Sequence, residues 1–133
     1  MLQTICYVSS TNYGIVYNDL RHLFHITKRN NIHLNVSGLL ILKNGNFLQL
    51  LEGEKQDVNK MYKKIRKDNR HHNIIQIINT SSRERLFENY DTGFAIVNNR
   101  RKLNQLKSYL NWLKVADMKR VNKLIHLLEN FIK

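Results

Sequence analysis

Two apolar runs joined by an Asn-Gly turn constrain this chain more than any other feature. Residues 36–42 and 46–51 are almost wholly apolar, and Lys43-Asn44-Gly45 connects them. Asn and Gly both tolerate the positive φ that a tight hairpin turn requires. The sequence therefore predicts an antiparallel β-hairpin in the middle of the chain.

The apolar periodicity predicts further strands and two helices around this hairpin. Asn18 is a candidate N-cap for the first helix, which we expect to run to about Lys28. The expected strands cover residues 3–8, 36–42, 46–51, 73–78 and 93–97, and the expected helices cover residues 18–28 and 58–65. This order predicts an α+β fold, a ferredoxin-like βαββαβ core with an additional strand and two helices on one sheet face.

The C-terminal residues 98–133 are expected to form a helical pair. Leu48 and Leu50 point away from the face that Phe47 and Leu51 share, so the second face of the sheet also needs a cover. An apolar stripe at helical spacing is available in the tail: Met118, Val121, Leu124, Ile125, Leu128, Phe131 and Ile132. We expect residues 1–97 to form one domain and the tail to pack on the other sheet face or at an oligomer interface.

Composition restricts the classes of function. The 133 residues include a single cysteine, Cys6, so no internal disulfide forms, and a cytoplasmic location is expected. No apolar run has the roughly 20 residues that a membrane-spanning helix needs. The net charge of +12 raises the possibility of nucleic-acid binding. However, aromatic residues are not interleaved with the basic ones as a single-strand binding surface requires.

Two polar residues stand out on inward faces of the predicted sheet. Gln49 lies between Phe47 and Leu51, and Tyr7 lies on the inward face of the first strand. A buried amide without hydrogen-bond partners costs about 1–3 kcal/mol. Gln49 is therefore either a structural residue bonded to backbone or, together with Tyr7, a contact for a polar ligand near the two helices.

Other motifs carry less chemistry by themselves. Asn30-Asn31 is typical of a helix C-cap and turn, and residues 68–72 are typical of a charged loop after a helix. His71 and His72 are adjacent, point in different directions and lack a nearby cysteine, so they do not predict a metal site. The chain has no phosphate-binding glycine loop and no paired catalytic carboxylates.

Taken together, the motifs resemble the BLUF domain, a sensor of blue light using FAD. The resemblance covers roughly residues 2–97, and the run from Phe47 to Gly53 is its most specific part. The matching segments are Ile5-Cys6-Tyr7-Val8-Ser9, Lys28-Arg29-Asn30-Asn31, Val36-Ser37-Gly38-Leu39-Leu40, Gly45-Asn46-Phe47-Leu48-Gln49-Leu50-Leu51-Glu52-Gly53 and Asp68-Asn69-Arg70-His71. The remainder is similar to the short type of this family, which carries tail helices without an effector domain.

The resemblance implies a non-covalent flavin, FAD or FMN, between the two helices. Tyr7 would bond to Gln49, and the Gln49 amide would contact the flavin and rearrange after Tyr7 gives up an electron and a proton. The other residues implied as flavin contacts are Ile26, Lys28, Arg29, Asn30, Asn31, Leu40, Phe47, Asp68, Arg70 and His71. Lys28 or Arg29 would meet ribityl or phosphate oxygens. The implied output is a signal to an unidentified partner protein, not an enzymatic reaction. Separately, the apolar residues Leu48 and Leu50 and the apolar stripe of the tail lead us to expect a homo-oligomer.

The fifth strand departs from the family pattern. Tyr90 occupies the usual Trp position and Thr92 the usual Met position. Thr92 offers a hydroxyl that is able to bond Gln49, and Tyr90 either packs at the entrance of the strand or offers a second electron donor. Both positions are expected to modulate the lit state. The alternatives are a basic ferredoxin-like module that binds nucleic acid and a small enzyme such as a phosphate-ester hydrolase.

Overall fold

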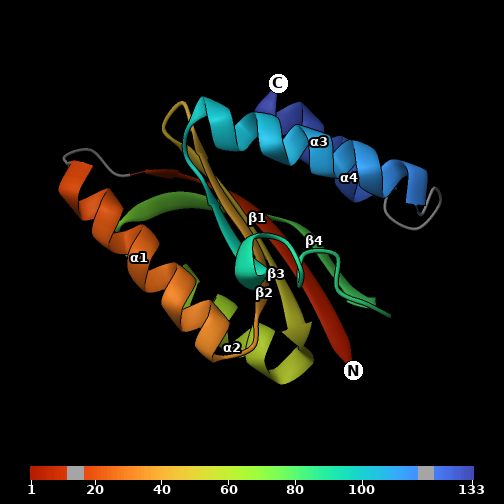
Figure 1. The fold of residues 1–133 in the computed structure, drawn as a ribbon. Coiled ribbons are helices and arrows are strands. Elements are labelled where there is room, and N and C mark those ends of the chain that lie inside the picture. Colours follow the sequence, from red (N-terminus) through yellow and green to blue (C-terminus); the bar gives the residue numbers. More distant parts are fainter. Residues whose placement is uncertain (12–16, 117–121) are drawn as a thin grey trace. The chain divides into compact units, whose positions relative to one another are not determined.

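A five-stranded sheet forms the centre of the protein. The computed structural model describes residues 1–11, 17–116 and 122–133, and their contacts divide the chain into two units, Met1–Ile96 and Val97–Lys133. The strands are β1 (Leu2–Thr11), β2 (Ser37–Lys43), β3 (Asn46–Glu54), β4 (His71–Ser82) and β5 (Phe94–Val97). Their order across the sheet is β4-β1-β3-β2-β5, and β1 runs antiparallel to both β3 and β4 (Figure 1). The predicted ferredoxin-like core with an extra strand is confirmed.

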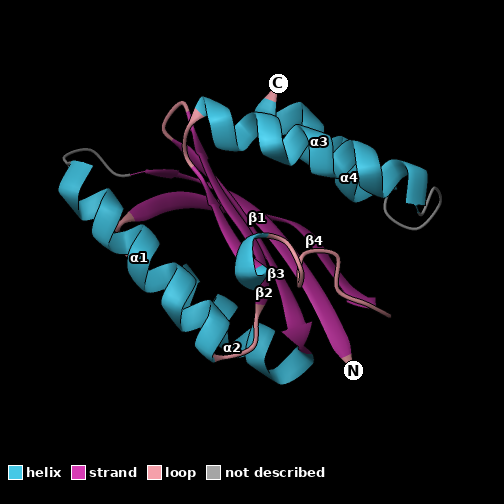
Figure 2. Ribbon diagram, viewed as in Figure 1, coloured by secondary structure: helices cyan, strands magenta, loops and turns pink. Residues whose placement is uncertain are grey.

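Two helices pack on one face of this sheet. They are α1 (Tyr17–His33) and α2 (Lys55–Arg66), and both lie on the same side of the strands (Figure 2). The hydrophobic core lies beneath them and consists of Ile5, Tyr7, Phe24, Val36, Leu40, Phe47, Leu51, Val58, Met61, Tyr62, Phe94 and Ile96. The inward face predicted for Tyr7 and the shared face predicted for Phe47 and Leu51 are confirmed.

The end of α1 differs from the prediction. The helix begins at Tyr17, before the predicted cap Asn18, and continues to His33, so Asn30 and Asn31 belong to its last turns rather than to a following turn. Asn35 adopts the left-handed conformation with φ 57°, and its N–H bonds to the carbonyl of Ile32 at 3.0 Å. The N–H of Val36 reaches the carbonyl of Asn31 at 2.8 Å. This pattern is a Schellman cap, and the asparagine that closes the helix is Asn35.

The hairpin between β2 and β3 forms as predicted. Asn44 and Gly45 both have positive φ, 54° and 77°, and Lys43 pairs with Asn46. Gly38 in β2 is under a different constraint: its φ is 141°, and a Cβ at this position would lie 1.9 Å from the carbonyl oxygen of Leu50 on β3. The two glycines therefore serve different needs, one for the turn and one for close strand approach.

A buried carboxylate ties β3 to the segment that leads into β5. Glu52 is 1 % exposed and accepts the backbone N–H groups of Leu86 at 2.8 Å and Phe87 at 2.6 Å. The Ser37 hydroxyl donates to the same carboxylate at 3.0 Å. Burial raises the pKa of Glu52, against these hydrogen bonds and the Arg85 charge, which lower it. The segment after β4 is thus held in place by hydrogen bonds to the Glu52 carboxylate on β3, a central strand of the sheet.

The second unit contains two helices, α3 (Arg100–Ala116) and α4 (Asn122–Ile132). They contact each other, and Lys114 on α3 pairs with Glu129 on α4 at 2.7 Å. Met118 and Val121 of the predicted stripe lie outside the described residues, while Leu124, Ile125, Leu128 and Ile132 are buried. The helical pair exists as predicted, and its proposed cover of the sheet stays a prediction. Within the described residues, no helix has both the length and the apolarity to cross a membrane.

We expect Gly38→Ala to lower the free energy of unfolding by about 2 kcal/mol or more, because the added methyl meets a backbone carbonyl on the neighbouring strand. Gly45→Asn is the matched control. Asn tolerates positive φ and the turn position is open, so its cost is below about 1 kcal/mol. Urea denaturation of both variants measures the difference. Equal losses would contradict the close approach at Gly38.

Candidate functional site

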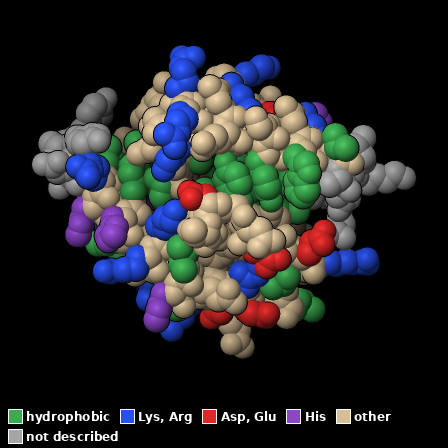
Figure 3. All heavy atoms as spheres, viewed as in Figure 1, with side chains coloured by type: hydrophobic (Ala, Val, Ile, Leu, Met, Phe, Trp, Pro, Cys, Tyr) green, Lys and Arg blue, Asp and Glu red, His purple; other side chains and the backbone are tan. Residues whose placement is uncertain are grey.

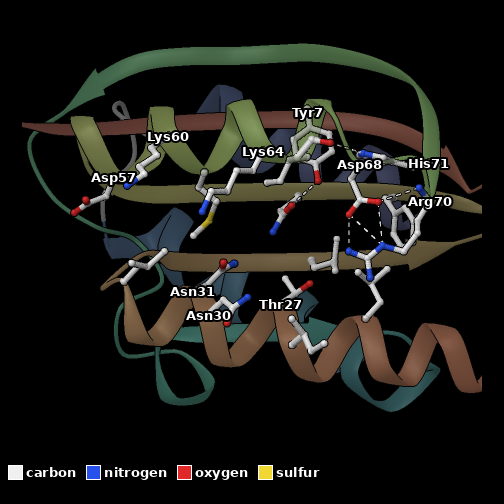
Figure 4. Close-up of a pocket in the computed structure, with 18 of the residues that line it drawn as sticks. Tyr7, Thr27, Asn30, Asn31, Asp57, Lys60, Lys64, Asp68, Arg70 and His71 are labelled. Carbon is white, nitrogen blue, oxygen red and sulfur yellow. Dashed lines mark hydrogen bonds and ion pairs between the residues drawn. The ribbon is translucent and has the colours of Figure 1, made fainter.

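A pocket of about 450 Å³ lies between α1, α2 and the sheet (Figure 4). The strands form its floor, and the two helices form its walls. The lining residues are Tyr7, Leu23, Ile26, Thr27, Asn30, Asn31, His33, Leu34, Leu40, Phe47, Gln49, Asp57, Lys60, Met61, Lys64, Ile65, Asp68, Arg70 and His71. A pocket of this size with apolar walls and a few polar groups is typical of a small-molecule binding site.

A hydrogen bond between Tyr7 and Gln49 lies at the floor of the pocket. The antiparallel register places the two residues opposite each other on β1 and β3. The Tyr7 hydroxyl donates to Gln49 Oε1, and both residues are 3 % exposed. Burial, with smaller contributions from nearby groups, raises the pKa of Tyr7. The phenol is therefore held in its neutral form and presents its proton to an amide oxygen.

Asn31 provides a buried donor without a protein acceptor. It is 3 % exposed, and its Nδ2 has no hydrogen-bond partner among the described residues. An unsatisfied buried amide costs about 1–3 kcal/mol, so such a group usually has a ligand or water as its partner. Because Asn31 lines the pocket, its Nδ2 is suited to bond an acceptor atom of a ligand there.

The ring nitrogens of His71 are both engaged by the protein. Nε2 lies 2.8 Å from the carbonyl oxygen of Ile65 and therefore donates to it, while Nδ1 lies 2.8 Å from the Ser9 hydroxyl oxygen. In the neutral ring, Nδ1 accepts the Ser9 proton. The ring also packs edge-on to Tyr7 and Phe47, at centroid distances of 6.0 and 6.4 Å. His71 thus contributes shape to the pocket and holds its neighbours in place.

One end of the pocket carries an ion pair between Asp68 and Arg70. The Arg70 Nε lies 3.0 Å from Asp68 Oδ1, and the Arg70 backbone N–H donates to the same oxygen at 2.9 Å. These bonds hold the pKa of Asp68 below its ordinary value. The charge of Arg70 at this end is therefore already compensated by the protein.

Ten of the predicted contact residues line the pocket: Tyr7, Ile26, Asn30, Asn31, Leu40, Phe47, Gln49, Asp68, Arg70 and His71. Lys28 and Arg29 are absent from the lining, and the Lys28 ammonium pairs with Asp91 at 3.3 Å. Their predicted contact with ribityl or phosphate oxygens stays a prediction that the lining does not support.

Tyr90 and Thr92 also lie outside the pocket lining. The Thr92 hydroxyl donates to the carbonyl oxygen of Asp91 at 2.6 Å, within a short 3₁₀ segment before β5. Tyr90 packs edge-on to Phe87 at a centroid distance of 6.1 Å. Their effect on the lit state remains a prediction, and the structure gives Thr92 a hydrogen-bond partner other than Gln49.

Sequence reasoning missed nine lining residues as site residues: Leu23, Thr27, His33, Leu34, Asp57, Lys60, Met61, Lys64 and Ile65. The helical spacing of the apolar residues Leu23, Met61 and Ile65 is a usable signal, because they pack in or against the core and the same helix faces border the pocket. The polar members give no comparable signal, since charged residues on a helix are usually solvated, and Lys and Arg side chains project from many parts of the face shown in Figure 3. In the described part of the chain, no cluster of His, Cys, Asp and Glu is suited to hold a metal ion.

The chain matches the model of one protein family, BLUF, described as sensors of blue light using FAD, over residues 2–93. It is 32% identical over 78 residues to the blue light- and temperature-regulated antirepressor BluF of Escherichia coli (strain K12). That match covers 59% of this chain and 19% of the antirepressor. The match therefore spans about a fifth of the length of that relative.

Solved structures are similar over almost the whole chain. Klebsiella pneumoniae BlrP1, in a calcium and cyclic di-GMP complex, gives a TM-score of 0.81 at 27% identity, covering 99% of this chain and 34% of that one. BlrP1 has also been solved with FMN and cyclic di-GMP. BlsA in its photo-activated state gives a TM-score of 0.72 at 26% identity, covering 99% of this chain and 95% of that one.

We expect Arg70→Gln to raise the pKa of Asp68 toward its ordinary value of 3.8, because Arg70 supplies the largest lowering effect. In the unmodified protein, the lowered pKa of Asp68 stabilises the folded state at pH values above the pKa that Asp68 has in the unfolded chain. This contribution is lost as the pH falls through the lowered pKa of the folded state. The variant should therefore lose less stability between neutral and acidic pH.

Carboxyl-carbon NMR of Asp68, with urea denaturation at several pH values, measures both effects. Arg66→Gln removes an equal charge from a guanidinium that lies over the Tyr62 ring at 5.9 Å, and it should leave Asp68 unchanged. An unchanged Asp68 pKa in Arg70→Gln would contradict the assignment.

Proposed function

The chain belongs to the BLUF family, sensors of blue light using FAD, and we propose that it binds a flavin in this pocket and signals blue light to a partner protein. The observation that carries the proposal is the buried hydrogen bond from Tyr7 to Gln49 on the pocket floor, beside the unpartnered donor of Asn31. We propose FAD or FMN as the flavin, because the family is described as using FAD and the similar protein BlrP1 has been solved with FMN.

The residues present fit a flavin. A flat ring with an apolar face suits the side chains of Ile26, Leu40 and Phe47, and its polar edge needs donors at the carbonyl oxygens. Asn31 Nδ2 is such a donor, since it is buried and without a protein acceptor in the described structure. Gln49 is a second amide in the lining and can offer either a donor or an acceptor.

A bound flavin supplies a strong oxidant when it absorbs blue light. The Tyr7 phenol is an electron donor in the pocket, and its burial raises its pKa, so loss of a proton alone is unfavourable. Electron loss makes the phenol strongly acidic, and its proton then has Gln49 Oε1 as a ready acceptor along an existing hydrogen bond.

The Gln49 amide is the group whose hydrogen bonds are expected to differ between the dark state and the lit state. Its oxygen and nitrogen ends have nearly the same shape and opposite hydrogen-bonding roles, so rotation or tautomerisation alters the bonds without altering the packing. We propose that Tyr7 recovers its proton from Gln49 and its electron from the flavin, and that Gln49 is left in a rearranged form. This is a local hydrogen-bond change with a wider structural effect.

We propose that the output is protein contact and not catalysis by this chain. The antirepressor among its relatives is blue-light regulated, and this chain corresponds to only a fifth of it, 19%, so activities of longer proteins are not transferred. We propose residues 98–133 as the surface for an effector or a second copy. A cytoplasmic location follows from the single buried cysteine as a proposal of the same kind.

An absorption spectrum before and after blue illumination tests the function. We expect flavin bands in the purified protein and a small red shift that decays in the dark. Gln49→Leu should keep the flavin bands and lose the shift. A colourless protein, even after reconstitution with FAD and FMN, would overturn the proposed function. A reversible shift in Gln49→Leu would overturn the role of Gln49.

Tyr7→Phe and Tyr62→Phe form a matched pair for the electron donor. Both rings are buried and lie with centroids 5.7 Å apart, but Tyr7 is the one whose hydroxyl donates to Gln49. We expect Tyr7→Phe to abolish the light-induced shift and Tyr62→Phe to retain it, as measured by difference absorption. Loss of the shift in Tyr62→Phe alone would contradict the assignment.

Asn31→Leu should act in opposite directions on stability and on binding. Removing an unsatisfied buried amide should raise the unfolding free energy of the flavin-free protein by up to about 1 kcal/mol, whereas flavin affinity should fall at least about tenfold. Urea denaturation and flavin fluorescence titration measure the two quantities. Asn30→Leu is the control, because Asn30 is exposed, and it should give no gain in stability. A loss of stability in Asn31→Leu would show that Asn31 is a structural residue.

A further inference from the structure

Two lysines line the pocket on one side of α2. Lys60 and Lys64 are one helical turn apart, so their side chains share a face, and both belong to the pocket lining. Figure 4 shows both side chains extending from α2 on the side that faces α1. Both are exposed, which places their ammonium groups at the opening of the pocket, above the buried floor.

These two positive charges are not compensated by an ion pair within the described residues. Asp57 is the one carboxylate of the lining on the same helix, and no ion pair joins it to either lysine. At the other end of the pocket Asp68 already neutralises Arg70. The opening therefore carries an excess of positive charge, which favours an anionic group on whatever binds below it.

A flavin with its N5 edge toward the floor of the pocket would place such a group at the opening. Its N5 and N10 atoms lie on opposite edges of the central ring, and the ribityl tail is attached to N10. If the N5 edge faces Gln49 on the floor, the tail leaves through the opening. The first phosphate of the tail is present in FMN and FAD and absent from riboflavin.

We propose that Lys60 and Lys64 form a binding site for the phosphate of the flavin tail, so that the protein selects FMN and FAD over riboflavin. This inference rests on the proposed flavin site. It also replaces Lys28 and Arg29 as the phosphate contacts, since neither lines the pocket and Lys28 pairs with Asp91. The phosphate of FMN is a monoester with a charge of about −1.5 to −2 at neutral pH, and the diphosphate of FAD carries two negative charges, so either tail has enough charge to interact with both ammonium groups.

The expected effect is moderate. An exposed pair of opposite charges contributes up to about fivefold in affinity, and two such pairs on one phosphate together give about tenfold. Because both lysines are exposed, salt screens the interaction, and the preference should shrink as ionic strength rises.

Titration of the flavin-free protein with riboflavin, FMN and FAD tests the proposal, with flavin fluorescence as the readout. The unmodified protein should bind FMN and FAD about tenfold more tightly than riboflavin at low salt. The double variant Lys60→Gln/Lys64→Gln should bind all three with the affinity of riboflavin. Unchanged riboflavin binding in that variant shows that the pocket is intact.

The double variant Lys63→Gln/Lys67→Gln is the matched control. It removes the same charge from exposed positions with the same spacing, outside the pocket lining, and should keep the preference for phosphorylated flavins. Equal affinities for riboflavin and FMN in the unmodified protein would overturn the lysine site and leave the flavin function standing. An equal loss in both double variants would also overturn it. Binding of none of the three flavins would overturn the proposed function itself.

Discussion

The antiparallel register between β1 and β3 is the constraint on which the site depends. It places Tyr7 opposite Gln49 and buries both, so that a phenol and an amide have each other as hydrogen-bond partners. A shift of one residue in this register would turn one of the two side chains to the other face of the sheet. The hairpin turn at Asn44-Gly45 sets the register of β3 against β2, and thereby supports the pairing from the other side.

The same strand carries polar groups on both of its faces. Gln49 faces the pocket, and Glu52, three residues later, accepts hydrogen bonds from Leu86 and Phe87 in the segment before β5. A change in bonding at Gln49 therefore occurs on a strand that is directly tied to this segment. Glu52 contributes a fixed link here, because its carboxylate is buried and its acceptors are used by backbone N–H groups and Ser37.

The sequence predicts the sheet and its core well because alternation and helical spacing report burial directly. Tyr7, Phe47, Gln49 and Leu51 all lie where the pattern places them. The prediction of where α1 ends was wrong for a local reason. Asn30, Asn31 and Asn35 are all able to close a helix, and the sequence alone does not show which one adopts positive φ. The capping bonds to Asn31 and Ile32 decide it.

The polar rim of the pocket is the part of the site that the sequence predicts least well, because its charged side chains are exposed to solvent. A lysine on an exposed helix face costs nothing to solvate, so its position carries no pattern that separates Lys60 and Lys64 from Lys63 and Lys67. Only the placement of α2 beside α1 brings Lys60 and Lys64, and not Lys63 and Lys67, to the border of the pocket. A buried amide such as Gln49 behaves differently, because it has to find hydrogen-bond partners or carry a cost, so it stands out in an apolar row. Tyr7 and Gln49 therefore stand out in the sequence, whereas the lysines at the rim of the pocket are identified only from the fold.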